Sequence, residues 1–111
     1  PWLADTGKKM LERLGYMVTA KSSGVEALEA VREHPDGFDL LITDMAMPNM
    51  TGDKLAQAVL RLRPDIPVIL CTGFSEAINE EKAREIGVKG FLMKPVDVTI
   101  LAKLIRKVLE K

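Results

Sequence analysis

The sequence predicts an α/β fold in which a parallel sheet lies between two layers of helices. Two short apolar runs, 38–43 (FDLLIT) and 67–72 (PVILCT), show no polar alternation, as is typical of strands covered on both faces. Between and around these runs, apolar residues recur at helical spacing. Strands that alternate with helices in this way form a doubly wound sheet joined by right-handed crossovers.

The chain is predicted to begin with a helix and a short strand. Apolar residues on one helical face predict a helix over 2–14, which Gly15 ends as a left-handed cap. The β-prone run 16–20 (YMVTA) follows as a strand. Ser23 and Glu26 then form a capping box at the start of a second helix, which runs to about residue 34.

The remaining elements follow the same alternation. A Pro-Asp-Gly turn leads to strand 38–43, and an amphipathic helix over 55–62 stops before a proline. After strand 67–72, residues 75–87 form a helix poor in large apolar side chains, so it is expected to be loosely held. A short strand, 90–93 (GFLM), precedes a last helix that Asp97 caps.

Composition limits the function. A chain of 111 residues is expected to form one domain, and its 16 basic and 16 acidic residues leave no net field to attract nucleic acid or a membrane. Charged residues interrupt every apolar stretch, so no membrane span or signal peptide is expected. The one cysteine, Cys71, lies in an apolar run and is interpreted as a packed thiol. We expect a soluble, cytoplasmic protein.

Three strand ends carry side chains that can react or bind a ligand. Asp44, Thr72 and Lys94 follow or end successive strands, and in a parallel sheet these ends meet at one edge, where ligands bind. A carboxylate can attack phosphorus to give an acyl phosphate, while an ammonium and a hydroxyl bind the phosphoryl oxygens. Mg²⁺ would suit the third oxygen, but it usually needs more than one carboxylate, and Ala46 offers only a main-chain carbonyl.

Each of these residues also has a structural interpretation. Asp44 could be a turn or helix-cap acid, Thr72 an ordinary strand residue, and Lys94 a solvated lysine before a proline. For Lys94, taken without its neighbours, the structural interpretation is favoured. His34 and the six methionines are interpreted as packing or surface residues.

Three motifs, TDMAMPNMTG, CTG and FLMKP, resemble in order and interval the receiver domains of two-component response regulators. The resemblance covers about residues 3–109 and includes LERLGY, GVEAL and IRKVL. It implies a flavodoxin-like sheet of strand order 2-1-3-4-5. The segment from GFSEA to MKPV is more loosely similar to receivers attached to hybrid sensor histidine kinases.

The resemblance also implies roles for individual residues. Asp44 would accept a phosphoryl group from a histidine kinase or a histidine phosphotransfer domain, and Thr72 and Lys94 would bind it. Phe91 would move together with Thr72, and a cis peptide before Pro95 would aim Lys94 inward. The family catalyses its own phosphorylation and dephosphorylation. These roles imply a switch of the surface around residues 73–94.

One departure from the family pattern concerns the metal. Members begin with an apolar strand ending in two acids that hold Mg²⁺ together with the counterparts of Asp44 and of the Ala46 carbonyl. Here the sequence opens on the first helix, and Asp5 within it is a poor substitute. The missing strand would lie at the centre of the sheet, so we expect either residues before Pro1 or a partner segment in the gap. Within 1–111 alone, weak Mg²⁺ binding is expected.

Two alternatives remain beside the phosphoacceptor. The first is a pseudo-receiver that cannot be phosphorylated and acts as an interaction module. The second is a hydrolase of the haloacid dehalogenase type, against which Ala46 counts because that class has an acid there. Ala46 and Phe74 offer water no polar anchor, so we expect a slowly hydrolysed acyl phosphate. Neither the oligomeric state, the stimulus nor the output is indicated, and a DNA-binding effector would lie outside these residues.

Overall fold

The computed structural model describes the chain except for residues 1–5, 22, 47–49, 74–79, 95–96 and 110–111. The described elements follow the predicted alternation. In order they are α1 (Thr6–Arg13), α2 (Gly24–Glu33), β1 (Leu41–Asp44), α3 (Gly52–Leu62), β2 (Val68–Thr72), α4 (Glu80–Ile86), β3 (Gly90–Met93) and α5 (Val98–Leu109).

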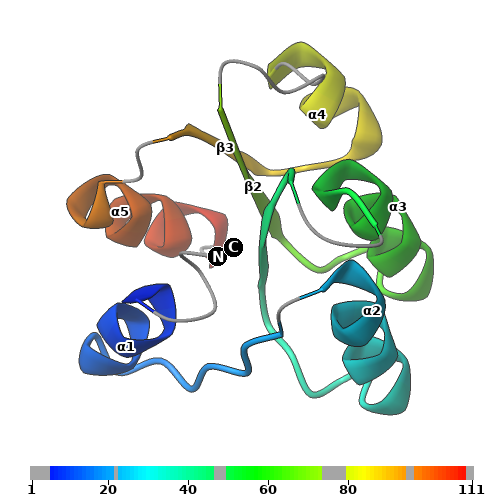
Figure 1. The fold of residues 1–111 in the computed structure, drawn as a ribbon, viewed down its shortest axis with the longest axis horizontal. Helices are drawn as coiled ribbons and strands as arrows, with labels where there is room; N and C mark the ends of the chain where they lie inside the picture. Colours follow the sequence, from blue (N-terminus) through cyan, green and yellow to red (C-terminus); the bar gives the residue numbers. More distant parts are fainter. Residues whose placement is uncertain (1–5, 22, 47–49, 74–79, 95–96, 110–111) are drawn as a thin grey trace.

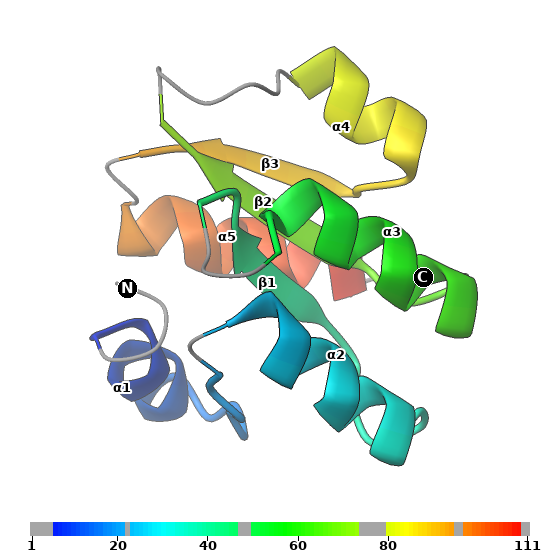
Figure 2. The ribbon, with the colours of Figure 1, turned by 45° about the vertical axis from the view of Figure 1, so that its right-hand side comes forward.

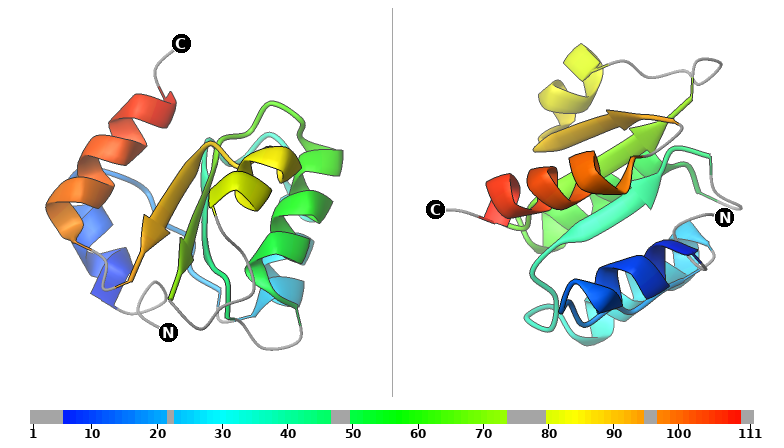
Figure 3. Two further views of the ribbon diagram at one scale, coloured as in Figure 1. Left: turned by 90° about the horizontal axis from the view of Figure 1, so that it is seen from above. Right: turned by 90° about the vertical axis from the view of Figure 1, so that its left-hand side faces the viewer.

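The strands form one parallel sheet in the order β1-β2-β3. Helices α1 and α5 cover one face, and α2, α3 and α4 cover the other (Figures 1 and 3). The same arrangement is seen from a second direction in Figure 2, where α5 passes behind the strands and α3 in front of them. The predicted α/β fold is confirmed, and the strand order matches a truncated flavodoxin-like sheet.

The prediction of a strand over 16–20 is wrong, because no residue in this segment has strand structure. A strand needs hydrogen-bonding partners, and β1 pairs with β2 while no described strand lies beside 16–20. Tyr16 and Val18 still pack against the core on the α1–α5 side, whereas Met17 is fully exposed. The side chains of this segment thus alternate between half-buried and exposed as in a strand, but its main chain is not paired with another described strand.

The strand predicted over 38–43 begins later, at Leu41, and extends to Asp44. Only Thr43 and Asp44 are buried, whereas Leu41 and Ile42 are half-buried. The expected burial on both faces is therefore incomplete, because β1 lies at an edge of the described sheet. The prediction holds fully for β2, in which all five residues are buried.

The predicted caps at Ser23, Asp97 and Gly15 are confirmed, whereas the helix predicted over 55–62 begins earlier, at Gly52. Ser23 caps α2, its hydroxyl oxygen accepting from the Glu26 N–H at 3.2 Å and lying 3.3 Å from the Glu26 carboxylate. The Asp97 carboxylate accepts from the N–H groups of Thr99 and Ile100 at the start of α5. Gly15 has a φ of +98°, the left-handed conformation expected after α1.

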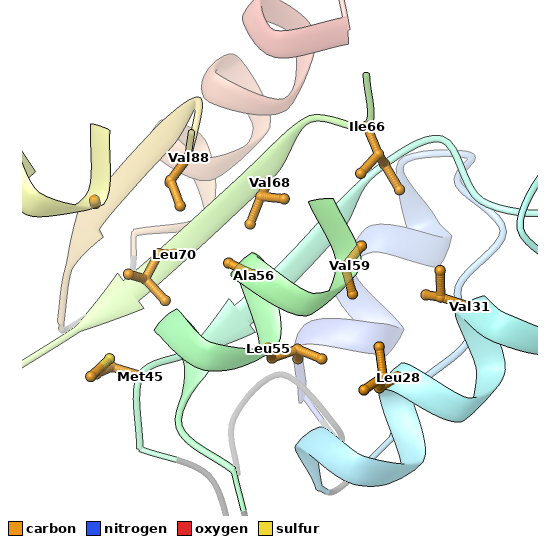
Figure 4. Packing of buried hydrophobic residues seen from close by; sticks show 11 residues of the cluster. Leu28, Val31, Met45, Leu55, Ala56, Val59, Ile66, Val68, Leu70 and Val88 are labelled. Atoms are coloured by element: carbon orange, nitrogen blue, oxygen red, sulfur yellow. The ribbon is translucent and has the colours of Figure 1, made fainter. Parts of the chain in front are cut away.

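The core has two parts, one on each face of the sheet. Between the sheet and helices α2 and α3, side chains such as Leu28, Leu55 and Leu70 converge (Figure 4). On the other face, Leu11 of α1 and Leu101 of α5 pack with residues of β2. Of the described α4 residues, Ala83 alone is buried, in agreement with the expected weakly packed helix.

No helix among the described residues combines the length and the apolar character required to cross a membrane.

Candidate functional site

Asp44 is the last residue of β1 and lies beside Cys71 of β2 in the strand register. Its residue exposure is only 5%. A carboxylate buried to this extent needs a positive or hydrogen-bonding partner, because desolvation disfavours its charged form. The partner comes from the far strand of the sheet.

That partner is Lys94, which directly follows β3. The Lys94 main-chain N–H donates to the Thr72 carbonyl at 2.7 Å, so the β2–β3 ladder fixes its backbone. Its ammonium Nζ lies 3.4 Å from Oδ1 of Asp44. The Lys94 side chain is 37% exposed and that of Asp44 is 7% exposed. The carboxylate of this ion pair is therefore buried, whereas the lysine side chain is partly in contact with solvent.

Thr72 is the last residue of β2 and is fully buried. It lies one residue after Cys71, the register partner of Asp44, and therefore between the strand ends that carry Asp44 and Lys94. In this structure its hydroxyl donates to the adjacent Gly73 carbonyl at 3.3 Å. The three strand-end residues thus occupy neighbouring positions at one edge, and the ammonium of Lys94 contacts the carboxylate of Asp44 there.

Cys71 lies directly against this site and is fully buried. Its pKa is raised to about 12, mainly by burial and also by the Asp44 carboxylate, while the Lys94 ammonium acts in the opposite direction. A thiol with such a pKa is protonated at neutral pH and is a poor nucleophile. The interpretation of Cys71 as a packed thiol agrees with this environment.

The loop after Asp44 is held by main-chain contacts that the sequence did not reveal. The Gly52 N–H, at the start of α3, donates to the Met45 carbonyl at 2.8 Å. A side chain at Gly52 would overlap the Asp44 carbonyl. The glycine that ends the TDMAMPNMTG motif was a possible signal, but a glycine alone does not tell which group approaches it.

The other predicted residues are less fully placed. Phe91 of β3 is half-buried and packs against the core on the α2–α3 side. Ala46 is exposed, two residues beyond Asp44. Asp5, Phe74 and Pro95 lie outside the described residues.

Receiver domains generally bind Mg²⁺ in an acidic pocket. Among the described residues, no group of three or more His, Cys, Asp or Glu side chains could hold a metal ion. Asp44 supplies one carboxylate, and the ammonium of Lys94 lies against it. Mg²⁺ usually needs more than one carboxylate ligand, so the described donor set does not fit this ion.

Comparisons with known proteins agree with this geometry. Residues 1–106 match the family model described as the response regulator receiver domain. The receiver protein CpdR of Brucella abortus is 37% identical over 102 residues, which cover 91% of this chain and 82% of that protein. The sensor kinase CckA of the same organism is 34% identical over 105 residues, 95% of this chain but 11% of the kinase.

Solved structures show the same similarity. A receiver domain protein of Clostridium thermocellum has a TM-score of 0.90 at 30% identity, covering 96% of this chain and 85% of that one. A CheY-like receiver of Methanospirillum hungatei has a TM-score of 0.85 at 31% identity, with coverages of 96% and 84%. The chain spans a fifth or less of several longer relatives, including a plant two-component regulator of which it covers 20%.

Proposed function

Since the chain belongs to the response-regulator receiver domain family, we propose that it is a phosphoacceptor in a two-component phosphorelay, with Asp44 as the acceptor. The observation that carries this proposal is the 3.4 Å contact between the Asp44 carboxylate and the Lys94 ammonium. The contact places a cation beside the proposed nucleophile, where it can neutralise the anionic group that Asp44 would receive.

The proposed reaction transfers a phosphoryl group from a phosphohistidine to Asp44. One carboxylate oxygen attacks phosphorus, an acyl phosphate forms, and the P–N bond breaks as the imidazole leaves with its electron pair. The ammonium of Lys94 then pairs with a phosphoryl oxygen and offsets the added negative charge. Its exposed side gives it room to follow that oxygen.

Thr72 would supply a second contact to the phosphoryl group. Its hydroxyl now bonds to the neighbouring Gly73 carbonyl, a weak and long hydrogen bond at 3.3 Å. Rotation about χ1 would exchange this acceptor for a charged oxygen. The half-buried side chain of Phe91 would move together with Thr72. The surface around residues 73–94 would change as a result, as in other proteins that are switched by a local change in charge and packing.

The relatives suggest the setting of this reaction. One is a sensor kinase and another a receiver protein, so the donor proposed here is a histidine kinase or a histidine phosphotransfer domain in the cytoplasm. We propose that these residues form the receiver domain of a longer protein, a hybrid sensor kinase. Receiver domains generally bind Mg²⁺, but the described residues do not supply a donor set for this ion.

Incubation with acetyl phosphate, with and without Mg²⁺, tests the proposal by intact mass. We expect the gain of one phosphoryl group, lost on treatment with hydroxylamine and absent in Asp44→Asn. A chain that stays unmodified under all conditions would support the pseudo-receiver, a possibility favoured by the single carboxylate of the described site. Sustained turnover of a phosphomonoester would instead support a hydrolase.

A further inference from the structure

The main chain of Asp44 is held by contacts that neither its side-chain chemistry nor its strand pairing requires. The N–H of Leu41 donates to the carbonyl of Pro67, just before β2, and the N–H of Met45 donates to the carbonyl of Cys71 in β2. Because successive residues of a strand direct their main-chain groups to opposite sides, the carbonyl of Asp44 points away from β2. On that side no described strand receives it.

Two residues reach this carbonyl instead. The hydroxyl of Thr43, a residue only 2% exposed, donates to the Asp44 carbonyl oxygen at 3.0 Å. Gly52, the first residue of α3, also lies directly against the same peptide group. We refer to Thr43 and Gly52 together as the carbonyl clamp.

The fit at Gly52 leaves no room for a side chain. A Cβ built there would overlap the Asp44 carbonyl oxygen and lie 2.8 Å from the carbonyl carbon and 2.8 Å from Cδ1 of Leu70. The first two obstacles are main-chain atoms, which cannot rotate aside. The Gly52 N–H also donates to the Met45 carbonyl at 2.8 Å, so the helix start cannot withdraw without losing a buried hydrogen bond.

We propose that Thr43 and Gly52 are positioning residues that orient the Asp44 carboxylate by fixing its carbonyl. The carbonyl carbon and the side chain share the Asp44 Cα, so a displacement of one turns the other relative to Lys94 Nζ, now 3.4 Å away. The catalytic part of this inference rests on the proposed phosphoacceptor function. The positional part does not, because it concerns the direction of a carboxylate.

The test uses paired substitutions. Gly52→Ala drives a methyl group into the Asp44 carbonyl, whereas Gly90→Ala places one 2.9 Å from Cγ1 of Ile69 and 3.0 Å from Cδ2 of Leu104, within the core and away from Asp44. Thr43→Val removes the hydroxyl at similar volume, and Thr43→Ser keeps it. Phosphorylation by acetyl phosphate is followed per folded molecule, at a temperature where urea titration shows every variant folded.

We expect Gly52→Ala and Thr43→Val to phosphorylate about tenfold more slowly, in keeping with the cost of misplacing a reacting group. Gly90→Ala and Thr43→Ser should stay within about twofold of the unmodified chain, because they leave the Asp44 carbonyl in place. Equal rates in all four variants, or a loss in Gly90→Ala as large as in Gly52→Ala, overturn the clamp. Should Gly52→Ala fail to fold, the two Thr43 variants decide.

A second readout separates the clamp from the proposed function. The carboxyl ¹³C signal of Asp44, identified by its loss in Asp44→Asn, reports the surroundings of the carboxylate without any phosphoryl transfer. It should move in Thr43→Val and remain in Thr43→Ser. If no variant, nor the unmodified chain, is phosphorylated, the proposed function fails while this signal still supports the clamp by moving or overturns it by staying.

Discussion

The ammonium of Lys94 lies 3.4 Å from the carboxylate of Asp44, although Asp44 ends β1, Lys94 follows β3, and β2 lies between them. The side chain of Lys94 therefore reaches across the end of the middle strand. The contact joins the two outer strands of the described sheet at the edge where the candidate site lies. It contributes both to the charge balance of the site and to the stability of the fold.

Removing this ammonium should destabilise the chain. Lys94→Met leaves the buried carboxylate of Asp44 unpaired, and we expect the free energy of unfolding to fall by about 1 kcal/mol. The loss is smaller than for a fully buried pair because solvent screens the 37% exposed lysine side chain. Urea titration measures it, and Lys103→Met on the exposed side of α5 is the control.

The same pair can be isolated in a double-mutant cycle. With Asp44→Asn already present, Lys94→Met should cost much less, because no carboxylate remains to be neutralised. Equal costs in the two backgrounds would show that the ammonium of Lys94 does not stabilise the fold through Asp44.

The stability of the chain should fall in alkaline solution because of Cys71. Its pKa is raised from 9.0 to about 12 in the folded state, so folding favours the protonated thiol. The stabilisation is fully present below pH 9 and is lost as the pH rises toward 12. Between pH 9 and 10.5 we expect a loss of about 1.5 kcal/mol from this group.

Other groups titrate in the same range, so the comparison with Cys71→Ala is decisive. This variant is expected to be less stable at every pH, since it leaves a small cavity, but to show a shallower decline above pH 9. Parallel curves for the two proteins would mean that the thiol does not carry the pH dependence.

The cap of α2 should contribute measurably. Ser23→Ala removes the hydroxyl that accepts from the Glu26 N–H, and we expect a loss of about 1 kcal/mol of unfolding free energy. Ser23→Asp keeps an acceptor at the cap and should recover most of it. Thr19→Ala, at an exposed residue outside the helices and strands, is the control.

The residue two positions after Asp44 should set the lifetime of the acyl phosphate. Ala46 is exposed, and its methyl group offers no hydrogen bond to an attacking water. Ala46→Asn is expected to accelerate dephosphorylation several-fold, followed by loss of mass after removal of the phosphodonor. Adding Phe74→Glu should accelerate it further, and an unchanged half-life in both variants would contradict the prediction.

Sequence patterns were sufficient where local chemistry decides the structure. The cap at Ser23, the left-handed Gly15 and the Asp97 cap depend on residues a few positions apart, and each is confirmed. The uniformly apolar run of β2 likewise predicted that this strand is completely buried. Period and capping therefore identified most elements.

Sequence patterns were insufficient where contact with another segment decides the structure. Residues 16–20 have strand propensity, but propensity cannot supply a partner, and no described strand pairs with them. The sequence brought Asp44 and Lys94 to one sheet edge, but it did not indicate the contact of Gly52 with the Asp44 carbonyl. Such a contact depends on how closely a helix start approaches a strand end, which side-chain patterns do not encode.

The complete burial of β2, with a parallel strand on each side within the described sheet, has a consequence for measurement. Amide protons in its centre, such as that of Leu70, can meet deuterated solvent only when the whole sheet opens. Their exchange rates therefore report the global equilibrium between folded and unfolded chain. Thr72 ends the same strand, so its main chain is joined directly to this protected segment.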